Sequence, residues 1–150
     1  MKKKILYVDM DGVLVNFQSG IDKLDNVNKS KYHGRYDEVP NIFSIMDPID
    51  GALDAFKKLS NLYDTYILST SPWSNKTALQ DKQNWIIKHL GEYGKKRLIF
   101  SHHKNLNIGD YLIDDREARG AKEFLGQHIW FGREPFENWN KVLEYLCIEK

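Results

Sequence analysis

Near the start of the chain, an apolar run is followed at once by two acids and a glycine. The run Ile5-Leu6-Tyr7-Val8 is typical of a strand buried inside a parallel sheet. Asp9 and Asp11 come directly after it, and Gly12 allows a tight turn without the steric penalty of a Cβ atom. Because ligands of open α/β sheets bind beyond the carboxyl ends of the strands, we expect both acids at a binding site. There they could bind a cation, attack an electrophile or transfer a proton.

Three further apolar runs also lead into polar residues. They cover about residues 67–68, 98–100 and 112–113, and the polar residues after them are Thr70 and Ser71, then Lys104, then Asp114 and Asp115. Acids suit Mg²⁺, hydroxyl groups suit phosphoryl oxygens, and a lysine offsets the charge of a phosphate. Together the strand ends predict a Mg²⁺-dependent phosphoryl-transfer site.

Strand and helix patterns alternate along the chain, which predicts a mostly parallel sheet with helices on both faces. We expect strands at about 4–9, 64–69, 97–100, 111–114 and 128–131, and helices at about 50–62, 75–90, 117–125 and from about 138. Ser74 or Asn75 would cap the second helix, against which Trp73 and Trp85 would pack. Residues 17–47 do not fit the alternation and form an insert rich in aromatic and turn-forming residues.

The order Asp-x-Asp, Ser/Thr, Lys and Asp-Asp resembles the four motifs of the haloacid dehalogenase (HAD) superfamily. The resemblance implies an α/β Rossmannoid fold of three layers, with the five strands in the order 5-4-1-2-3. The length of 150 residues predicts a single domain over residues 1–150, and the resemblance implies that residues 17–47 form a small cap inserted after the first strand. Members of this superfamily mostly act through an aspartyl-phosphate.

The resemblance implies a role for each motif residue. Asp9 would be the nucleophile and Asp11 the general acid and base. The phosphoryl group would be held by Thr70, Ser71 and Lys104. Mg²⁺ would be bound by Asp9, the backbone carbonyl of Asp11, Asp114 and Asp115, with Asp115 preferred over Asp114 as a direct ligand.

Four longer stretches closely resemble the 5′(3′)-deoxyribonucleotidases: residues 9–17, 41–52, 69–72 and 112–116. This family hydrolyses deoxyribonucleoside monophosphates with Mg²⁺ and binds the base with aromatic residues of the cap. Phe17 and Phe43 are the corresponding substrate-binding positions here. The insert is shorter than the cap of the better-known members, and His102 stands where they have a basic residue two positions before the lysine.

The composition narrows the possible partners. The sequence has 22 basic and 21 acidic residues, so we expect no stable nucleic-acid partner, and a phosphatase of nucleic-acid ends is disfavoured. No apolar stretch reaches the roughly 18 residues of a membrane span. The single cysteine, Cys147, cannot form an internal disulfide, which fits a cytoplasmic protein.

We therefore expect the binding partner to be a small phosphate monoester, namely a nucleotide. The sequence leaves open whether the protein forms a homodimer. Two alternatives also stay open. One is a phosphatase of another small phosphorylated metabolite, and the other is a phosphate- or metal-binding module without enzymatic activity.

Overall fold

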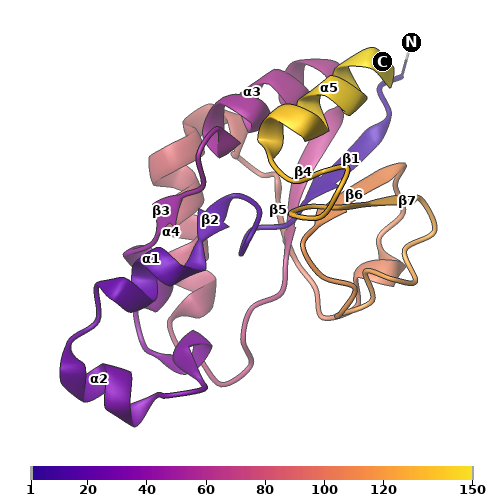
Figure 1. Ribbon diagram of the computed structural model, residues 1–150. Coiled ribbons are helices and arrows are strands. Elements are labelled where there is room, and N and C mark those ends of the chain that lie inside the picture. The colour runs from indigo at the N-terminus through magenta and orange to yellow at the C-terminus, as the bar shows by residue number, and fades with distance from the viewer. Residues whose placement is uncertain (1, 150) are drawn as a thin grey trace.

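The structure is a computed structural model that describes residues 2–149. Its main sheet contains β1 (Ile5–Val8), β4 (Asp64–Ser69), β5 (Leu98–Phe100), β6 (Tyr111–Asp114) and β7 (Gln127–Trp130). The strands lie in the order β5-β4-β1-β6-β7, and every neighbouring pair is parallel (Figure 1). If the five strands of this sheet are numbered along the chain, their order from β7 to β5 is 5-4-1-2-3, which is the predicted order. β1 is the middle strand of this sheet, and its Leu6 and Val8 are fully buried.

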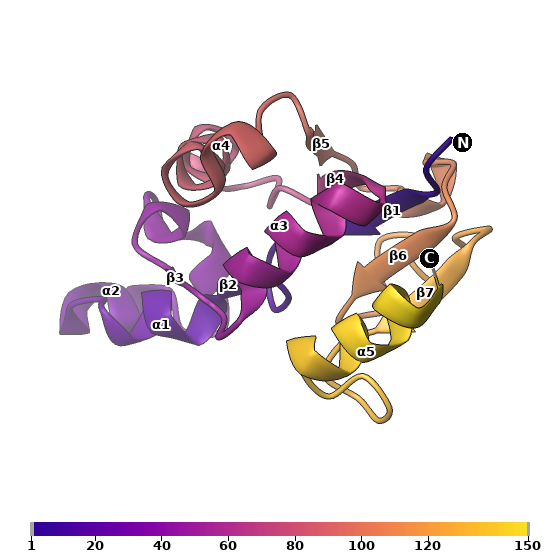
Figure 2. The ribbon, with the colours of Figure 1, turned by 90° about the horizontal axis from the view of Figure 1, so that it is seen from above.

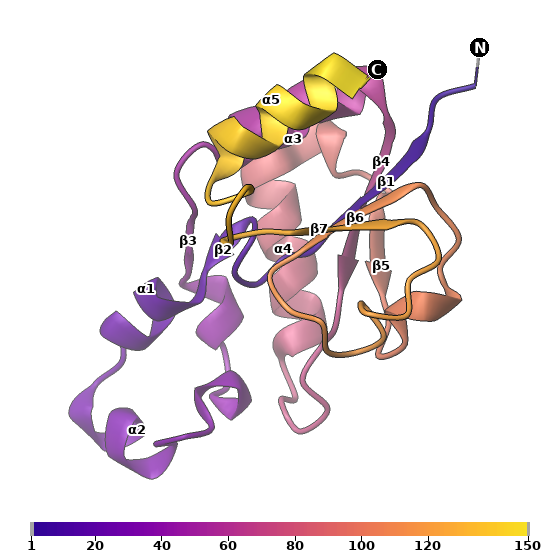
Figure 3. The same cartoon turned by 45° about the vertical axis from the view of Figure 1, so that its right-hand side comes forward.

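A second, two-stranded sheet was not predicted. β2 (Val15–Asn16) pairs antiparallel with β3 (Asp47–Pro48), so the ribbon closes the base of residues 17–47, here called the insert. The insert contains α1 (Phe17–Asp22), α2 (Asn26–Lys31) and the short 3₁₀ helices η1 (Tyr36–Glu38) and η2 (Ile42–Ser44). Figures 1 and 3 show α1 and α2 at the opposite end of the molecule from α3 and α5.

One face of the main sheet is covered by the three long helices α3 (Ala52–Leu62), α4 (Ala78–Leu90) and α5 (Trp139–Glu149) (Figure 2). Apolar residues of these helices and of the insert share one large core with the sheet. In α5, Trp139 is buried and its indole N–H donates to the Val13 carbonyl at 2.8 Å. None of the helices in the described part of the chain is long and apolar enough to cross a membrane.

The other face is covered by turns, so the prediction of a helix over residues 117–125 was wrong. Ala121 and Phe124 from this segment pack on Tyr7, Leu68 and Leu112 of the sheet. The helix is interrupted because two consecutive residues, at 119 and 120, have φ angles of 58° and 84°. The covering layer is present, but it is irregular.

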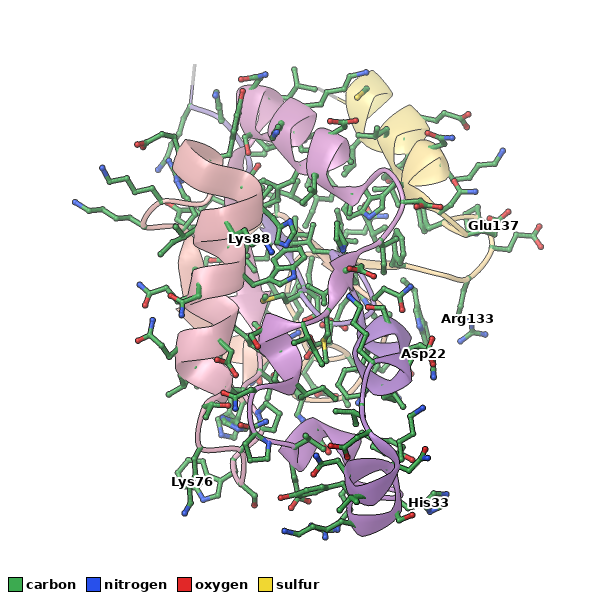
Figure 4. All side chains as sticks on the ribbon, turned by 90° about the vertical axis from the view of Figure 1, so that its left-hand side faces the viewer. Asp22, His33, Lys76, Lys88, Arg133 and Glu137 are labelled. Carbon is green, nitrogen blue, oxygen red and sulfur yellow. The ribbon has the colours of Figure 1, made fainter. Side chains whose placement is uncertain are left out.

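The start of α4 also differs from prediction. The helix begins at Ala78, and neither Ser74 nor Asn75 caps it. Instead, the Asn75 amide donates to the carbonyls of Asp37 and Val39 at 2.9 and 3.0 Å, which ties the insert to this loop. In Figure 4, His33 of the insert and Lys76 of the loop lie at the same end of the molecule.

The two tryptophans near this helix have different positions. Trp85 is buried, as predicted, and its indole N–H donates to the Met46 carbonyl at 2.8 Å. Trp73 is 90% exposed, so its predicted role in helix packing was wrong.

Candidate active site

The polar residues at the strand ends meet around one cavity of about 490 Å³. Asp9 follows β1, Thr70 follows β4, Asp114 ends β6, and Lys104 begins the 3₁₀ turn η4 (Lys104–Leu106) after β5. The opposite wall comes from the insert and includes Phe17, Gly34, Tyr36 and Asp37. The cavity therefore lies between the carboxyl edge of the sheet and the insert.

Lys104 lies between two of the acids. Its Nζ atom is 3.0 Å from Asp9 Oδ1 and 2.6 Å from Asp114 Oδ2, and its side chain is 3% exposed. Burial acts to lower the lysine pKa, but Asp9 and Asp114 outweigh it, so the pKa is raised and the charge is kept. An ammonium group has three N–H donors, so one remains for a substrate oxygen.

Asp9, Asp114 and Asp115 form a compact acidic cluster. Each offers an oxygen within 4.8 Å of the others. Burial raises the pKa of Asp9 to about 7, and burial together with the charge of Asp9 raises the pKa of Asp115 to about 7. Burial also raises the pKa of Asp114. When ionised, the three carboxylates repel one another. A divalent cation bound between them would offset this repulsion, and closely spaced carboxylate oxygens are ligands that suit Mg²⁺.

Gly12 makes room for this cluster. Its φ angle is +79°, and a Cβ atom built on it would lie only 2.1 Å from Asp115 Oδ2. The sequence indicated only a tight turn here. The structure adds a second reason for glycine, which is the close approach of a carboxylate.

Asp11 stands apart from the acidic cluster, although it lines the same cavity. Its Oδ2 atom accepts a hydrogen bond from Lys82 Nζ at 3.0 Å. Its Oδ1 atom is buried and has no hydrogen-bond partner among residues 2–149. The second acid of the motif is thus held by a separate lysine.

Lys82 was missed by the sequence analysis. It lies on α4 and is fully buried. A signal was available, because Lys82 is four residues after Ala78 and three before Trp85, which places it on the apolar face of the helix. A lysine on such a face needs a partner, but the sequence does not say which acid that is.

Thr70 and Ser71 occupy different places. Thr70 lines the cavity, and its hydroxyl donates to the Ser101 carbonyl at 2.8 Å. Ser71 is buried and is not among the residues that line the cavity. Of these two residues, Thr70 presents its side chain to the cavity, whereas the role expected for Ser71 was that of a backbone N–H donor and stays a prediction.

The two phenylalanines of the insert are in contact, with ring centroids 5.9 Å apart. Phe17 lines the cavity, whereas Phe43 is 1% exposed and lies behind it. Tyr36 lines the cavity as well, and its hydroxyl donates to the Lys29 carbonyl at 3.2 Å. The aromatic surface open to a ligand is thus made by Phe17 and Tyr36, with Phe43 as support.

Comparisons with known proteins identify the sequence family. The sequence model of the family described as "5′ nucleotidase, deoxy (Pyrimidine), cytosolic type C protein" matches residues 22–142. A protein of Vibrio phage KVP40 with the proposed activity of a 5′(3′)-deoxyribonucleotidase is 54% identical over 147 residues, which cover 98% of this chain and 86% of the relative. The human 5′(3′)-deoxyribonucleotidase, cytosolic type, is 31% identical over 155 residues, covering 83% of this chain and 77% of the human protein.

Solved structures support the fold. The HAD-hydrolase YfnB from Bacillus subtilis, bound to magnesium, superposes with a TM-score of 0.66 at 14% identity and covers 97% of this chain and 99% of its own. A haloacid dehalogenase-like hydrolase of Streptococcus pneumoniae gives 0.60 at 15% identity, over 99% of both chains. The family model and the sequence relatives show that the chain belongs to the cytosolic type C 5′-nucleotidase family, and the two solved structures show that it has the fold of haloacid dehalogenase-like hydrolases.

Proposed function

We propose that the protein hydrolyses deoxyribonucleoside monophosphates with the aid of Mg²⁺ and through a phosphoryl group carried on Asp9. The observation that carries this proposal is the placement of Lys104. Its ammonium group bridges Asp9 and Asp114 at the strand ends and keeps one N–H free, in a cavity that has an aromatic wall opposite. Such a site supplies a nucleophile, a fixed positive charge and a surface for a base.

In the first step, a carboxylate oxygen of Asp9 attacks the phosphorus atom and the bond to the nucleoside oxygen breaks. The electron pair of that bond goes to the nucleoside oxygen, which takes a proton from the Asp11 carboxyl group. In the second step, water attacks the phosphorus atom and gives a proton to Asp11. The bond to Asp9 breaks, which releases phosphate and restores the Asp9 carboxylate.

Mg²⁺ would be held by Asp9, Asp115 and the backbone carbonyl of Asp11, with Asp114 beside them. When bound, it would offset the negative charge of the phosphoryl group and the acids. Asp114 is the weaker choice for a direct ligand because both of its oxygens already accept hydrogen bonds, from Lys104 at 2.6 Å and from the Arg116 backbone at 3.0 Å.

The substrate preference depends on Phe17 and Tyr36. Both line the cavity opposite the acids, so a base attached to the phosphate through its sugar would meet their rings. Aromatic contacts contribute about 0.5–1.5 kcal/mol beyond the buried area. We place the reaction in the cytoplasm, on the ground that the human relative is a cytosolic type.

A screen of the purified protein with Mg²⁺ against all deoxyribonucleotides, sugar phosphates and p-nitrophenyl phosphate tests this function. We expect higher kcat/KM for deoxyribonucleotides than for sugar phosphates. Phe17→Ala should raise KM about two- to tenfold for deoxyribonucleotides, and little for sugar phosphates, which have no aromatic ring to stack on Phe17. Tyr93→Ala is the matched control, because Tyr93 is an exposed aromatic residue outside the cavity.

A phosphatase of another small metabolite is the second candidate. It is favoured by one observation, namely that Phe43 does not reach the cavity and leaves a small aromatic surface. A parent enzyme that shows no preference for deoxyribonucleotides over sugar phosphates would support this candidate against the nucleotidase. Equal losses on deoxyribonucleotides and sugar phosphates in Phe17→Ala would mean that Phe17 is a packing residue.

A further inference from the structure

We propose that Lys82 is a positioning residue that holds the Asp11 carboxyl group in place for proton transfer. This inference rests on the proposed function, because it assigns to Lys82 a part in the same reaction. Lys82 lies on α4, outside the four motifs that carry the acids and Lys104, and it is not among the residues that line the cavity.

The Lys82 ammonium group has no capacity left for a substrate. Its Nζ atom is within hydrogen-bond distance of Asp11 Oδ2 at 3.0 Å, Ser69 Oγ at 2.8 Å and the Thr70 carbonyl at 2.8 Å. These contacts use all three N–H donors. The ring centroid of Phe43 lies 4.6 Å from the same atom, and the side chain is 0% exposed. Lys104 differs because one of its donors is free, so the two lysines have separate tasks.

Asp11 depends on this contact for its orientation. Lys82 is the hydrogen-bond partner that the structure records for the Asp11 carboxylate, whose Oδ1 atom has no partner among residues 2–149. Burying an ammonium group is strongly unfavourable unless its charge is compensated, and Asp11 provides the opposite charge for Lys82. Without Lys82, the Asp11 carboxylate would lose the contact that fixes its rotation.

The other two partners of Lys82 set where Asp11 is held. Ser69 is the last residue of β4, and Thr70 follows it at the edge of the cavity. Lys82 thus ties the acid after β1 to the end of β4, the strand end that presents the Thr70 hydroxyl. The distance between Asp11 and the phosphoryl site is therefore set by the neighbouring strands β1 and β4.

The chemistry of the leaving group separates this role from a purely structural one. A nucleoside oxygen is a poor leaving group and needs a proton from Asp11 as its bond to phosphorus breaks. A p-nitrophenolate ion is a good leaving group and needs little help. Both reactions need Asp11 again when water attacks the phosphoryl group on Asp9.

The test compares Lys82→Met with the parent enzyme on a deoxyribonucleotide and on p-nitrophenyl phosphate, with Mg²⁺ present. We expect kcat for the deoxyribonucleotide to fall about 100-fold or more, with KM little changed, as for the loss of a general acid. With p-nitrophenyl phosphate, we expect a rapid burst of one nitrophenolate per enzyme, followed by slow turnover. Turnover of both esters by the parent enzyme is the separate check of the proposed function.

A double variant sharpens the result. Asp11→Asn combined with Lys82→Met should be no slower than Asp11→Asn alone, because both changes remove the same function. Losses that multiply, or equal losses on both esters without a burst, would overturn the inference. Trp85→Phe is the matched control, since it weakens another buried contact of α4 and should not discriminate between the esters.

Ser69→Ala keeps the inference testable if Lys82→Met fails to fold. This change removes one anchor of the ammonium group and leaves its ion pair with Asp11. We expect a smaller loss in the rate of the first step, in which Asp9 takes the phosphoryl group, again larger for the deoxyribonucleotide than for p-nitrophenyl phosphate. An unchanged ratio between the first-step rates of the two esters in a folded Ser69→Ala variant would overturn the inference.

Discussion

Raising the pH should destabilise the metal-free protein, because the acidic cluster is held together most easily when it is protonated. The pKa of Asp9 is raised from 3.8 to about 7 in the folded chain, mainly by burial. The folded state therefore binds more protons than the unfolded state between these values. Its stability is greatest at the acidic end of this window and is lost as the pH rises through about 7.

The size of the effect follows from the shift. One pKa unit corresponds to about 1.4 kcal/mol, so the part of the window between pH 5 and pH 7 corresponds to about 3 kcal/mol. We include the pKa shift of Asp9 alone. The pKa shift of Asp115 is not independent of it, because the charge of Asp9 is one of its causes. For a chain of this length, about 3 kcal/mol lowers the melting temperature by roughly 6–12 °C.

The assay is thermal unfolding in chelator at about pH 5 and about pH 8, repeated at the higher pH with Mg²⁺. We expect a lower melting temperature at the higher pH and its recovery on addition of Mg²⁺, which binds the ionised acids. Asp115→Asn should raise the melting temperature of the metal-free protein at the higher pH and reduce its dependence on pH. This comparison isolates the cluster from His89, whose lowered pKa acts in the opposite direction. A metal-free protein equally stable at both pH values, and unchanged in Asp115→Asn, would refute the reasoning.

Three further predictions concern the metal, the turn and the insert. Chelator should abolish turnover and Mg²⁺ should restore it, whereas Ca²⁺ should inhibit, because its longer and looser coordination does not suit the same geometry. Gly12→Ala should weaken the response of activity to Mg²⁺ in a metal titration, because the new Cβ atom would overlap Asp115 Oδ2. Asn75→Ala should lower the free energy of unfolding by about 1–3 kcal/mol in a urea titration, because it leaves two carbonyls of the insert without their donor. The exposed Asn84→Ala on α4 is its control and should change stability by less than about 0.5 kcal/mol.

The strands and the acids at their ends could be predicted because each signal is local. Leu6 and Val8 are fully buried, so β1 reads as a continuous apolar run, and the polar residues begin where the strand stops. Parallel strands then bring Asp9, Asp114 and Lys104 to one edge without any further information.

The errors come from contacts between distant parts of the chain. Residues 117–125 include good helix formers, but the Arg119 carbonyl accepts a hydrogen bond from the Lys104 backbone at 2.7 Å, with positive φ angles at 119 and 120. This hydrogen bond outweighs the helix propensity of residues 117–125 and fixes the position of the loop that carries Lys104. The partner of Lys82 lies 71 residues away, so no local pattern could reveal the pair with Asp11.

The aromatic positions show the same limit. Both Phe17 and Phe43 were expected to face a base, yet only Phe17 lines the cavity. Phe43 packs over Lys82 instead, which depends on how η2 meets α4. Sequence reasoning located the aromatic wall in the insert and could not rank its members.

The most direct test of the account is to look for the phosphoryl group on Asp9. Asp11→Asn should still be phosphorylated by p-nitrophenyl phosphate but should lose the phosphoryl group slowly, because water then lacks its base. Rapid quenching in acid and mass spectrometry of peptides should find one added phosphoryl group on the peptide with Asp9, and none in an Asp9→Asn/Asp11→Asn double variant. Phosphate carried on another residue, or turnover near the parent level in Asp9→Asn, would contradict the account.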